Sequence, residues 1–155
     1  MRNDSWQARL EQADAAYDDE AYRLAFRLYL RLAMEGCADA QVQVGYMLQE
    51  GEGVRQDDRL ALGWYRAAAE QNHPVGLRNV GICYADGEGV ARDPVEAVHW
   101  LRRSAQLGDD VAQFMMGEAY HFGQGVAQDA RRAEHWYRLA AAQSNEHAVR
   151  NLAIL

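Results

Sequence analysis

The chain has 155 residues and a formal net charge of −7, so its length predicts a single domain or an array of repeats. Alanine contributes 27 residues, threonine is absent, and valine and isoleucine together number 13, which favours an all-α protein over a β-sheet. All 16 basic residues are arginine, which excludes the lysine chemistry of P-loops and Schiff bases, and an acidic chain without a basic block is a poor ligand for nucleic acid.

The first stretch, residues 5–36, predicts a helical hairpin. Its apolar positions are Ala13, Tyr22, Ala25, Tyr29 and Leu32. The N-terminus lacks the apolar centre of a signal peptide, and no apolar run approaches the ~20 residues that a membrane span needs. Two cysteines, Cys37 and Cys83, do not make a disulfide framework. We therefore expect a cytoplasmic protein that does not contact a membrane.

From residue 37 onward the sequence repeats with a period of 36 residues. The same residue types recur at this offset in the glycines Gly45, Gly81 and Gly117, in the tryptophans Trp64, Trp100 and Trp136, and in the loops 51–54, 87–90 and 123–126. The loops read Gly-Glu-Gly-Val twice and Gly-Gln-Gly-Val once. So many coincidences at one offset establish a structural repeat.

Each repeat predicts two antiparallel helices joined by the Gly-x-Gly-Val loop. In the first unit the first helix spans about residues 40–50, with small or apolar side chains three and four residues apart. Gly45 inside this stripe costs about 1 kcal/mol relative to alanine, so we expect the backbone of a neighbouring helix to approach it closely. The second helix begins after an aspartate (Asp57, Asp93 or Asp129), and Pro94 and Glu96 complete the start signal in the middle unit. The inner face of that middle helix is expected at Ala97, Leu101, Ser104 and Ala105.

A hairpin of this kind cannot bury both of its faces, so neighbouring hairpins must stack. The prediction is an all-α, right-handed α/α superhelical solenoid of about nine antiparallel helices. We assign residues 1–155 to one repeat domain: the hairpin 5–36, three units at 37–72, 73–108 and 109–144, and a C-terminal half-repeat or capping helix at 145–155.

These motifs resemble the Sel-one-like repeat (SLR) family, whose members are related to tetratricopeptide repeats. The family pattern of Leu-Gly, Tyr, Gly-x-Gly-Val, Asp, Ala, Trp-Tyr and Ala-Ala is similar to residues 40–71, 76–107 and 112–143, and residues 5–36 are similar to an ordinary tetratricopeptide unit. The resemblance implies a non-catalytic adaptor for another protein or a peptide. It also implies two alternatives, an immunity-type protein that sequesters a toxin and a cell-wall-related hydrolase or binder.

The residues themselves give little support to catalysis or to a cofactor. The Gly-x-Gly loops lack the third glycine and the preceding strand of a dinucleotide site. Glu118 and His121 have the spacing of a di-iron motif, but the motif is not duplicated. Neither Cys37 nor Cys83 belongs to a Cys-x-x-Cys pair, and no serine has a base at a meaningful spacing. We predict a protein that is not an enzyme and has neither metal nor cofactor.

The binding surface should lie where the repeats differ from one another. The aromatic pairs Trp64-Tyr65 and Trp136-Tyr137, at a fixed place in the repeat, are expected in the core between repeats, as is Trp100. By analogy with tetratricopeptide solenoids, the non-core positions of the first helices face a concave groove, and the predicted protein-binding residues there are Val42, Tyr46, Gln49, Arg78, Asn79, Ile82, Phe114, Glu118, His121 and Phe122. For Phe114 and Phe122, filling a gap between repeats is an equally weighted alternative. The expected oligomeric state is a monomer or a weak homodimer.

Overall fold

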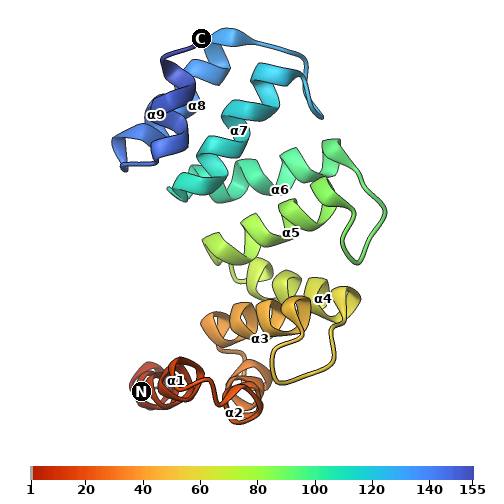
Figure 1. The fold of residues 1–155 in the computed structure, drawn as a ribbon, viewed down its shortest axis with the longest axis vertical. Helices are drawn as coiled ribbons and strands as arrows, with labels where there is room; N and C mark the ends of the chain where they lie inside the picture. The colour runs from red at the N-terminus through yellow and green to blue at the C-terminus, as the bar shows by residue number, and fades with distance from the viewer. Residues whose placement is uncertain (1) are drawn as a thin grey trace. The chain divides into compact units, whose positions relative to one another are not determined.

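The described part of the chain is entirely helical. A computed structural model describes residues 2–155, with side chains from residue 5 onward. Over these residues there are nine α-helices and no strand (Figure 1). The helices are α1 (Arg2–Asp18), α2 (Tyr22–Met34), α3 (Ala38–Glu50), α4 (Asp58–Glu70), α5 (Pro74–Asp86), α6 (Pro94–Gln106), α7 (Asp110–Phe122), α8 (Ala130–Ala142) and α9 (Glu146–Leu152). The predicted all-α fold class is confirmed.

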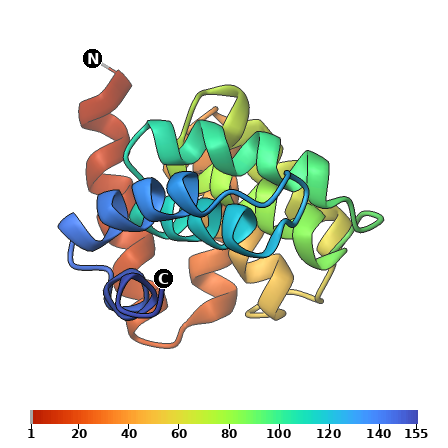
Figure 2. The same cartoon turned by 90° about the horizontal axis from the view of Figure 1, so that it is seen from above.

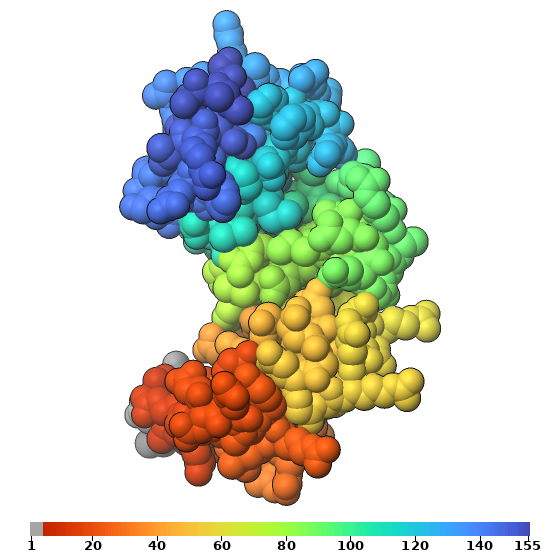
Figure 3. Space-filling view, in the orientation of Figure 1, coloured from red at the N-terminus to blue at the C-terminus, as the bar shows by residue number. Residues whose placement is uncertain are grey.

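The chain divides into two compact units, Met1–Gly76 and Leu77–Leu155, called unit 1 and unit 2 below. In unit 1, α1 packs on α2, α2 on α3, and α3 on α4. In unit 2, α6 packs on α7, α7 on α8, and α8 on α9. Figure 2 shows α7 (cyan) beside α8 (blue), and Figure 3 shows the blue C-terminal residues at the surface of unit 2. Helices adjacent in sequence are therefore adjacent in space, as expected for a repeat array.

The second helices begin at the residues that the sequence predicts, directly after Asp57, Asp93 and Asp129. The side chain of Asp57 accepts a hydrogen bond from the amide of Leu60, and Asp93 accepts from the amides of Val95 and Glu96. Two first helices are capped in the same manner, α7 by Asp109 and α9 by Asn145, whereas Cys37 before α3 makes no side-chain cap. Each such cap satisfies amides that have no partner inside the helix, and its loss typically costs about 1 kcal/mol.

The Gly-x-Gly-Val loop is a tight connection between helices. Gly51 and Gly53 have φ angles of 73° and 68°, in the left-handed region that glycine tolerates best. A Cβ at Gly53 would also collide with the backbone of Tyr22, at the start of α2. In unit 2, Gly125 meets the backbone of Pro94 at the start of α6 in the same way. The second glycine of the loop is thus required by its contact with the preceding repeat.

Glycine is needed inside the first helices for a different reason from the one expected. A Cβ at Gly45 would lie 2.5 Å from the ring of Tyr65, and a Cβ at Gly81 would lie 2.7 Å from the side chain of Leu101. Gly117 faces the ring of Tyr137 in the same way. The expectation that a neighbouring backbone approaches Gly45 was wrong, because a side chain of the second helix occupies this space.

The core between helices consists mainly of tyrosine and alanine. Tyr65 and Tyr137 are almost fully buried, as are the predicted inner-face residues Ala97, Leu101, Ser104 and Ala105. The tryptophans, which we expected in this core, are only half-buried. Trp100 shows why: its Nε1 donates to Glu96 Oε1 at 3.0 Å, and the guanidinium of Arg103 lies 5.1 Å from its ring centre. A ring whose edge and face make polar contacts remains near the surface.

Pairs of glutamines, which were not predicted from the sequence, link successive hairpins. In unit 1, Gln71 Nε2 donates to Gln41 Oε1 and to the carbonyl of Gly36, both at 3.0 Å. Gln41 in turn donates to the carbonyl of Ala33 at 3.2 Å. In unit 2, Gln113 and Gln143 repeat the arrangement, with carbonyls of residues 105 and 108 as acceptors. The middle repeat has leucine at both corresponding positions, 77 and 107. The two positions therefore change type together from repeat to repeat. This joint change was the sequence signal from which their contact could have been predicted.

Candidate protein-interaction site

In unit 1 the predicted binding residues lie on α3 and differ in exposure. Val42 is 8% exposed and belongs to the core, whereas Tyr46 is 40% exposed. Gln49 is half-buried and accepts a hydrogen bond from the hydroxyl of Tyr65 at 2.9 Å. Of these three side chains, Tyr46 has the largest free surface.

Tyr46 belongs to a cluster of tyrosines around one carboxylate. The hydroxyl of Tyr17 donates to Glu52 Oε2 at 2.6 Å, and the rings of Tyr17 and Tyr22 meet edge to face with centres 5.2 Å apart. The pKa of Tyr17 is raised well above its usual value, first by the bond to Glu52 and then by burial, with smaller contributions from Tyr46. The contact of Tyr17 with Glu52 was not predicted, because the two residues come from a hairpin and a loop far apart in the sequence.

In unit 2 the predicted residues on α5 are held by their surroundings. Arg78 Nη1 forms an ion pair with Asp109 Oδ2 at 2.8 Å, and both side chains are largely buried. Asn79 and Ile82 are half-buried. Arg78 therefore also joins α5 to the cap of α7, which reduces its freedom to bind a partner.

The predicted aromatic residues on α7 have different environments. Phe114 is half-buried, with its ring centre 5.8 Å from Tyr137 and 5.7 Å from His147. Phe122 is 60% exposed, and its ring stacks on His121 with centres 4.5 Å apart and planes 2° from parallel. The alternative of gap filling thus applies to Phe114, whereas Phe122 presents its ring to solvent.

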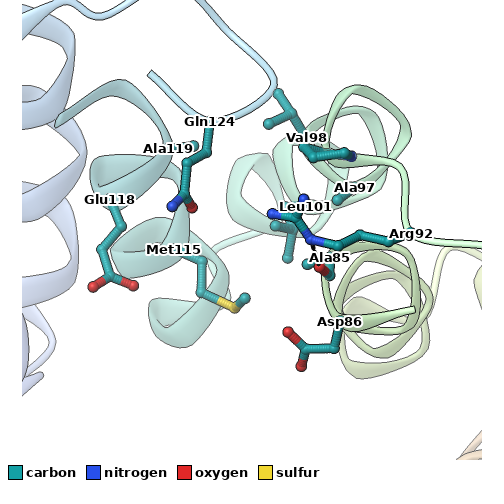
Figure 4. A pocket seen from close by; sticks show the side chains of 11 residues that line it. Ala85, Asp86, Arg92, Ala97, Val98, Leu101, Met115, Glu118, Ala119 and Gln124 are labelled. Carbon is teal, nitrogen blue, oxygen red and sulfur yellow. Dashed lines mark hydrogen bonds between the residues drawn. The ribbon is translucent and has the colours of Figure 1, made fainter. Parts of the chain in front are cut away.

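A pocket of about 430 Å³ opens in unit 2 (Figure 4). The residues that line it come from α5, α6, α7 and the adjoining loops: Ala85, Asp86, Arg92, Pro94, Ala97, Val98, Leu101, Met115, Glu118, Ala119 and Gln124. Figure 4 shows Met115, Glu118 and Gln124 on one side of the opening and Arg92 and Asp86 on the other. The predicted residue Glu118 is therefore part of a concave site, but the other nine predicted residues do not line it.

The pocket coincides with a local departure from the repeat. In the first unit the hydroxyl of Tyr65 bonds to Gln49, and in the third unit the hydroxyl of Tyr137 lies 3.4 Å from His121 Nδ1. The corresponding residues of the middle unit are Ala85 and Leu101, which are shorter and apolar, and both line the pocket. Because the ring and its hydrogen-bonding partner are both absent here, the space between the first helices is left open.

The lining of the pocket has more acidic than basic side chains: Glu118 and Asp86 against Arg92. Burial raises the pKa of Glu118, and the imidazoles of His147 and His121 oppose this shift. Neither Glu118 nor Asp86 makes a hydrogen bond or ion pair with another described residue. Arg92, in contrast, donates from Nε to the carbonyl of Ala85 at 2.9 Å. The lining of the site thus has two carboxylates and one guanidinium.

Other chemical centres are not evident in the described residues. No group of three or more His, Cys, Asp or Glu side chains could hold a metal ion within residues 5–155. Glu118 and His121 lie on one helix, but no further ligands join them there. In the part of the chain that the structure describes, none of the helices has the length and apolarity required to cross a membrane.

The family model of the Sel1 repeat matches four consecutive segments, residues 19–37, 38–73, 74–109 and 110–145. The chain belongs to the Sel1 repeat family. The resemblance to the SLR family is thereby confirmed, and the match extends into the N-terminal hairpin. Sel1 repeat proteins are generally protein-interaction scaffolds, and their fold is typically non-catalytic.

Solved structures support the same fold. A Sel1 repeat protein from Oxalobacter formigenes is 31% identical, with a TM-score of 0.89 over 94% of this chain and 59% of that one. The protein c5321, a protective antigen of uropathogenic Escherichia coli with an SLR fold, is 32% identical, with a TM-score of 0.79 over 90% of this chain and 34% of that one. The immunity protein Pa5087 from Pseudomonas aeruginosa is 22% identical, with a TM-score of 0.64 over 88% of this chain and 55% of that one. The chain thus spans less than two thirds of each of these proteins, and no curated protein matches it.

Proposed function

We propose that this chain is a non-catalytic scaffold that binds a partner protein or peptide through the side chains that its first helices leave outside the core. The observation that carries the proposal is the exposure of two aromatic rings, Tyr46 and Phe122, at positions where the repeats differ. Ile82 and Glu118 stand where the first unit has Tyr46, and Glu50 and Asp86 stand where the third has Phe122. Exposed aromatic side chains that the repeat does not require are typical of binding hot spots.

Each unit contributes its own part of the proposed surface. In unit 1 it comprises Tyr46 and Gln49, together with the neighbouring Tyr17 and Tyr22. In unit 2 it comprises Arg78, Asn79, Ile82, Phe114, Glu118, His121 and Phe122. We omit Val42, because a side chain with 8% exposure offers a partner little surface.

The test is affinity capture with the immobilised chain, followed by crosslinking and mass spectrometry. A specific partner should be captured by the wild type and lost with the double variant Tyr46→Ala, Phe122→Ala. Val95→Ala is the matched control, because Val95 is 67% exposed but lies on a second helix. Circular dichroism should show unchanged helix content in both. If the double variant captures the partner as well as the control does, the assigned surface is wrong.

An immunity-type role is the second candidate, favoured by the net charge of −7. An acidic protein associates faster with a basic toxin through long-range electrostatic attraction. The P. aeruginosa immunity protein shares the fold, which makes the role compatible with this architecture. A toxin gene next to the gene for this chain, and protection of cells that express both, would support it over the adaptor role. An adjacent regulatory or secretion gene would oppose it.

The proposal places the scaffold in the cytoplasm as a monomer or weak homodimer. Its support is the chemistry of the cysteines, since Cys37 and Cys83 are both free and buried, and disulfides are characteristic of oxidising compartments. Cell fractionation with an antibody and light scattering of the purified chain test the two statements separately.

A further inference from the structure

We propose that the pocket of unit 2 receives an arginine side chain of the partner, with Glu118 and Asp86 as the carboxylates that bind its guanidinium. The inference rests on the proposed function and specifies the chemistry of one contact within it.

The shape of the pocket suits a side chain with a long apolar stem. Ala97, Val98 and Leu101 form one wall, and Met115 lies opposite them (Figure 4). A volume of about 430 Å³ lies near the lower end of the range for small-molecule sites, about 300–1,000 Å³. Apolar walls with polar groups at the opening match the three methylenes and the terminal charge of arginine.

The charge of the pocket favours a cation over an anion, because its lining has two carboxylates, Glu118 and Asp86, and one guanidinium, Arg92. In Figure 4 the carboxylates of Glu118 and Asp86 lie on opposite sides of the opening, with Met115 between them in this view. Neither carboxylate has a hydrogen bond or ion pair within the described residues, and Arg92 already donates to the Ala85 carbonyl. Because burial disfavours the ionised form of Glu118, a bound cation would offset a cost that the free protein bears.

Arginine fits this arrangement better than the other charged side chains. Its planar guanidinium has five donors in a fixed geometry and can bond to two carboxylates at once, while it is less strongly hydrated than an ammonium group. A lysine offers a compact and strongly hydrated charge. A glutamate would lie beside Glu118 and Asp86, and Arg92 alone would offset the repulsion.

The probe is the tripeptide acetyl-Leu-Arg-Leu-amide, titrated into the ¹⁵N-labelled chain and followed by NMR. Its counterpart contains citrulline, which keeps the shape of arginine but is uncharged. We expect saturable shifts at the amides of residues 85–86 and 115–119 with the arginine peptide. Binding of the citrulline peptide should be weaker by about tenfold or more, because hydrogen bonds between two charged groups are the strong ones.

Two variants assign the effect to the pocket. Glu118→Gln and Asp86→Asn should each weaken the arginine peptide by about tenfold, whereas Glu70→Gln, an exposed glutamate in unit 1 with the same loss of charge, should leave its affinity unchanged. Equal binding of the two peptides, shifts centred outside the pocket, or no saturable shift in the millimolar range would overturn the inference.

Failure of this inference is distinguishable from failure of the proposed function. A partner captured by the wild type and lost with Tyr46→Ala, Phe122→Ala supports the scaffold function whatever the peptides do. If that partner is retained unchanged by Glu118→Gln and by Asp86→Asn, only the arginine site is wrong.

Discussion

At the scale of single residues, the size of a side chain on one helix determines which residue fits at the facing position of the helix packed against it. Gly45 faces the ring of Tyr65, and Gly117 faces that of Tyr137. In the middle repeat Leu101 replaces the ring, and Ala85 stands where Gln49 and His121 lie in the other two. The substitution keeps the fold but leaves a pocket. Differences of one or two residues between otherwise matching repeats can thus create a binding site.

Two helix glycines of unit 1 give opposite predictions. Gly45→Ala should destabilise the chain by about 1–3 kcal/mol, because the new methyl group overlaps the ring of Tyr65 in a packed core. Gly63→Ala should stabilise it by about 1 kcal/mol, since nothing lies within 4 Å and alanine is the better helix former. Urea denaturation measures both. A Gly45→Ala variant as stable as Gly63→Ala would show that the ring does not restrict this position.

Glu118 provides a prediction about pH. Its pKa is raised by burial, so the folded state binds a proton more tightly than the unfolded state, in which the usual value is 4.5. The stability that its protonated form supplies is present below 4.5 and is lost as the pH rises through the folded-state value. Glu118→Gln should therefore be more stable than wild type at neutral pH.

This difference should shrink as the pH falls to about 4. The imidazoles of His121 and His147 oppose the effect of burial on the pKa of Glu118, so the convergence should be less steep than for an isolated carboxyl. Denaturation midpoints across the pH range measure it, with Glu70→Gln as the exposed control. A constant difference between Glu118→Gln and wild type at all pH values would contradict the prediction. Together with the expected loss of arginine binding, the result would identify Glu118 as a residue that binds at the expense of stability.

At the scale of helices, each glutamine pair joins three consecutive helices, which in unit 2 are α6, α7 and α8. Gln143 Nε2 donates to Gln113 Oε1 at 2.9 Å and to the carbonyl of Gly108 at 2.8 Å. Gln113 donates to the carbonyl of Ala105 at 3.2 Å and is itself 6% exposed. A buried amide with all its partners present stabilises the packing, and the same amide with one partner removed is costly.

A double-mutant cycle tests this coupling. The middle repeat, with leucine at 77 and 107, indicates that the two positions tolerate apolar side chains when both change. Gln113→Leu and Gln143→Leu should each destabilise the chain by about 1–2 kcal/mol, and the double variant should lose less than the sum, with a coupling of about 1 kcal/mol. Additive losses measured by urea denaturation would show that the two amides act independently.

The helices could be predicted from the sequence more fully than their contacts. Caps and loops depend on residues within a few positions of one another, so Asp57 and Gly53 could be assigned from the repeat alone. The choice of Tyr65 rather than Trp64 for the core depends on the rotation of α4 against α3, and a pattern of aromatic residues does not fix that rotation. Among the predicted binding residues, Val42 and Phe122 illustrate the same difficulty, because both occupy a first helix but one is buried and the other exposed.

At the scale of the whole molecule, packing is local in both compact units. The helices α1–α4 in unit 1 and α6–α9 in unit 2 contact mainly their neighbours in the sequence, as in other repeat proteins. In such chains stability is approximately a sum over repeats and their interfaces rather than the property of a single core. A local defect should therefore open one part of the chain before the rest.

Hydrogen exchange followed by mass spectrometry tests this expectation with matched defects in the two units. Gly45→Ala should speed exchange in α3 and α4 by about tenfold or more and leave α7 and α8 nearly unchanged, because only the local opening free energy is lowered. Gly117→Ala, which meets the ring of Tyr137, should give the reverse pattern. If either variant accelerated exchange equally in both pairs of helices, the chain would unfold as one cooperative body. In that case an arginine bound by Glu118 would slow hydrogen exchange in α3 and α4 as strongly as in α7. If the chain unfolds locally, bound arginine should slow exchange only in the helices around the pocket.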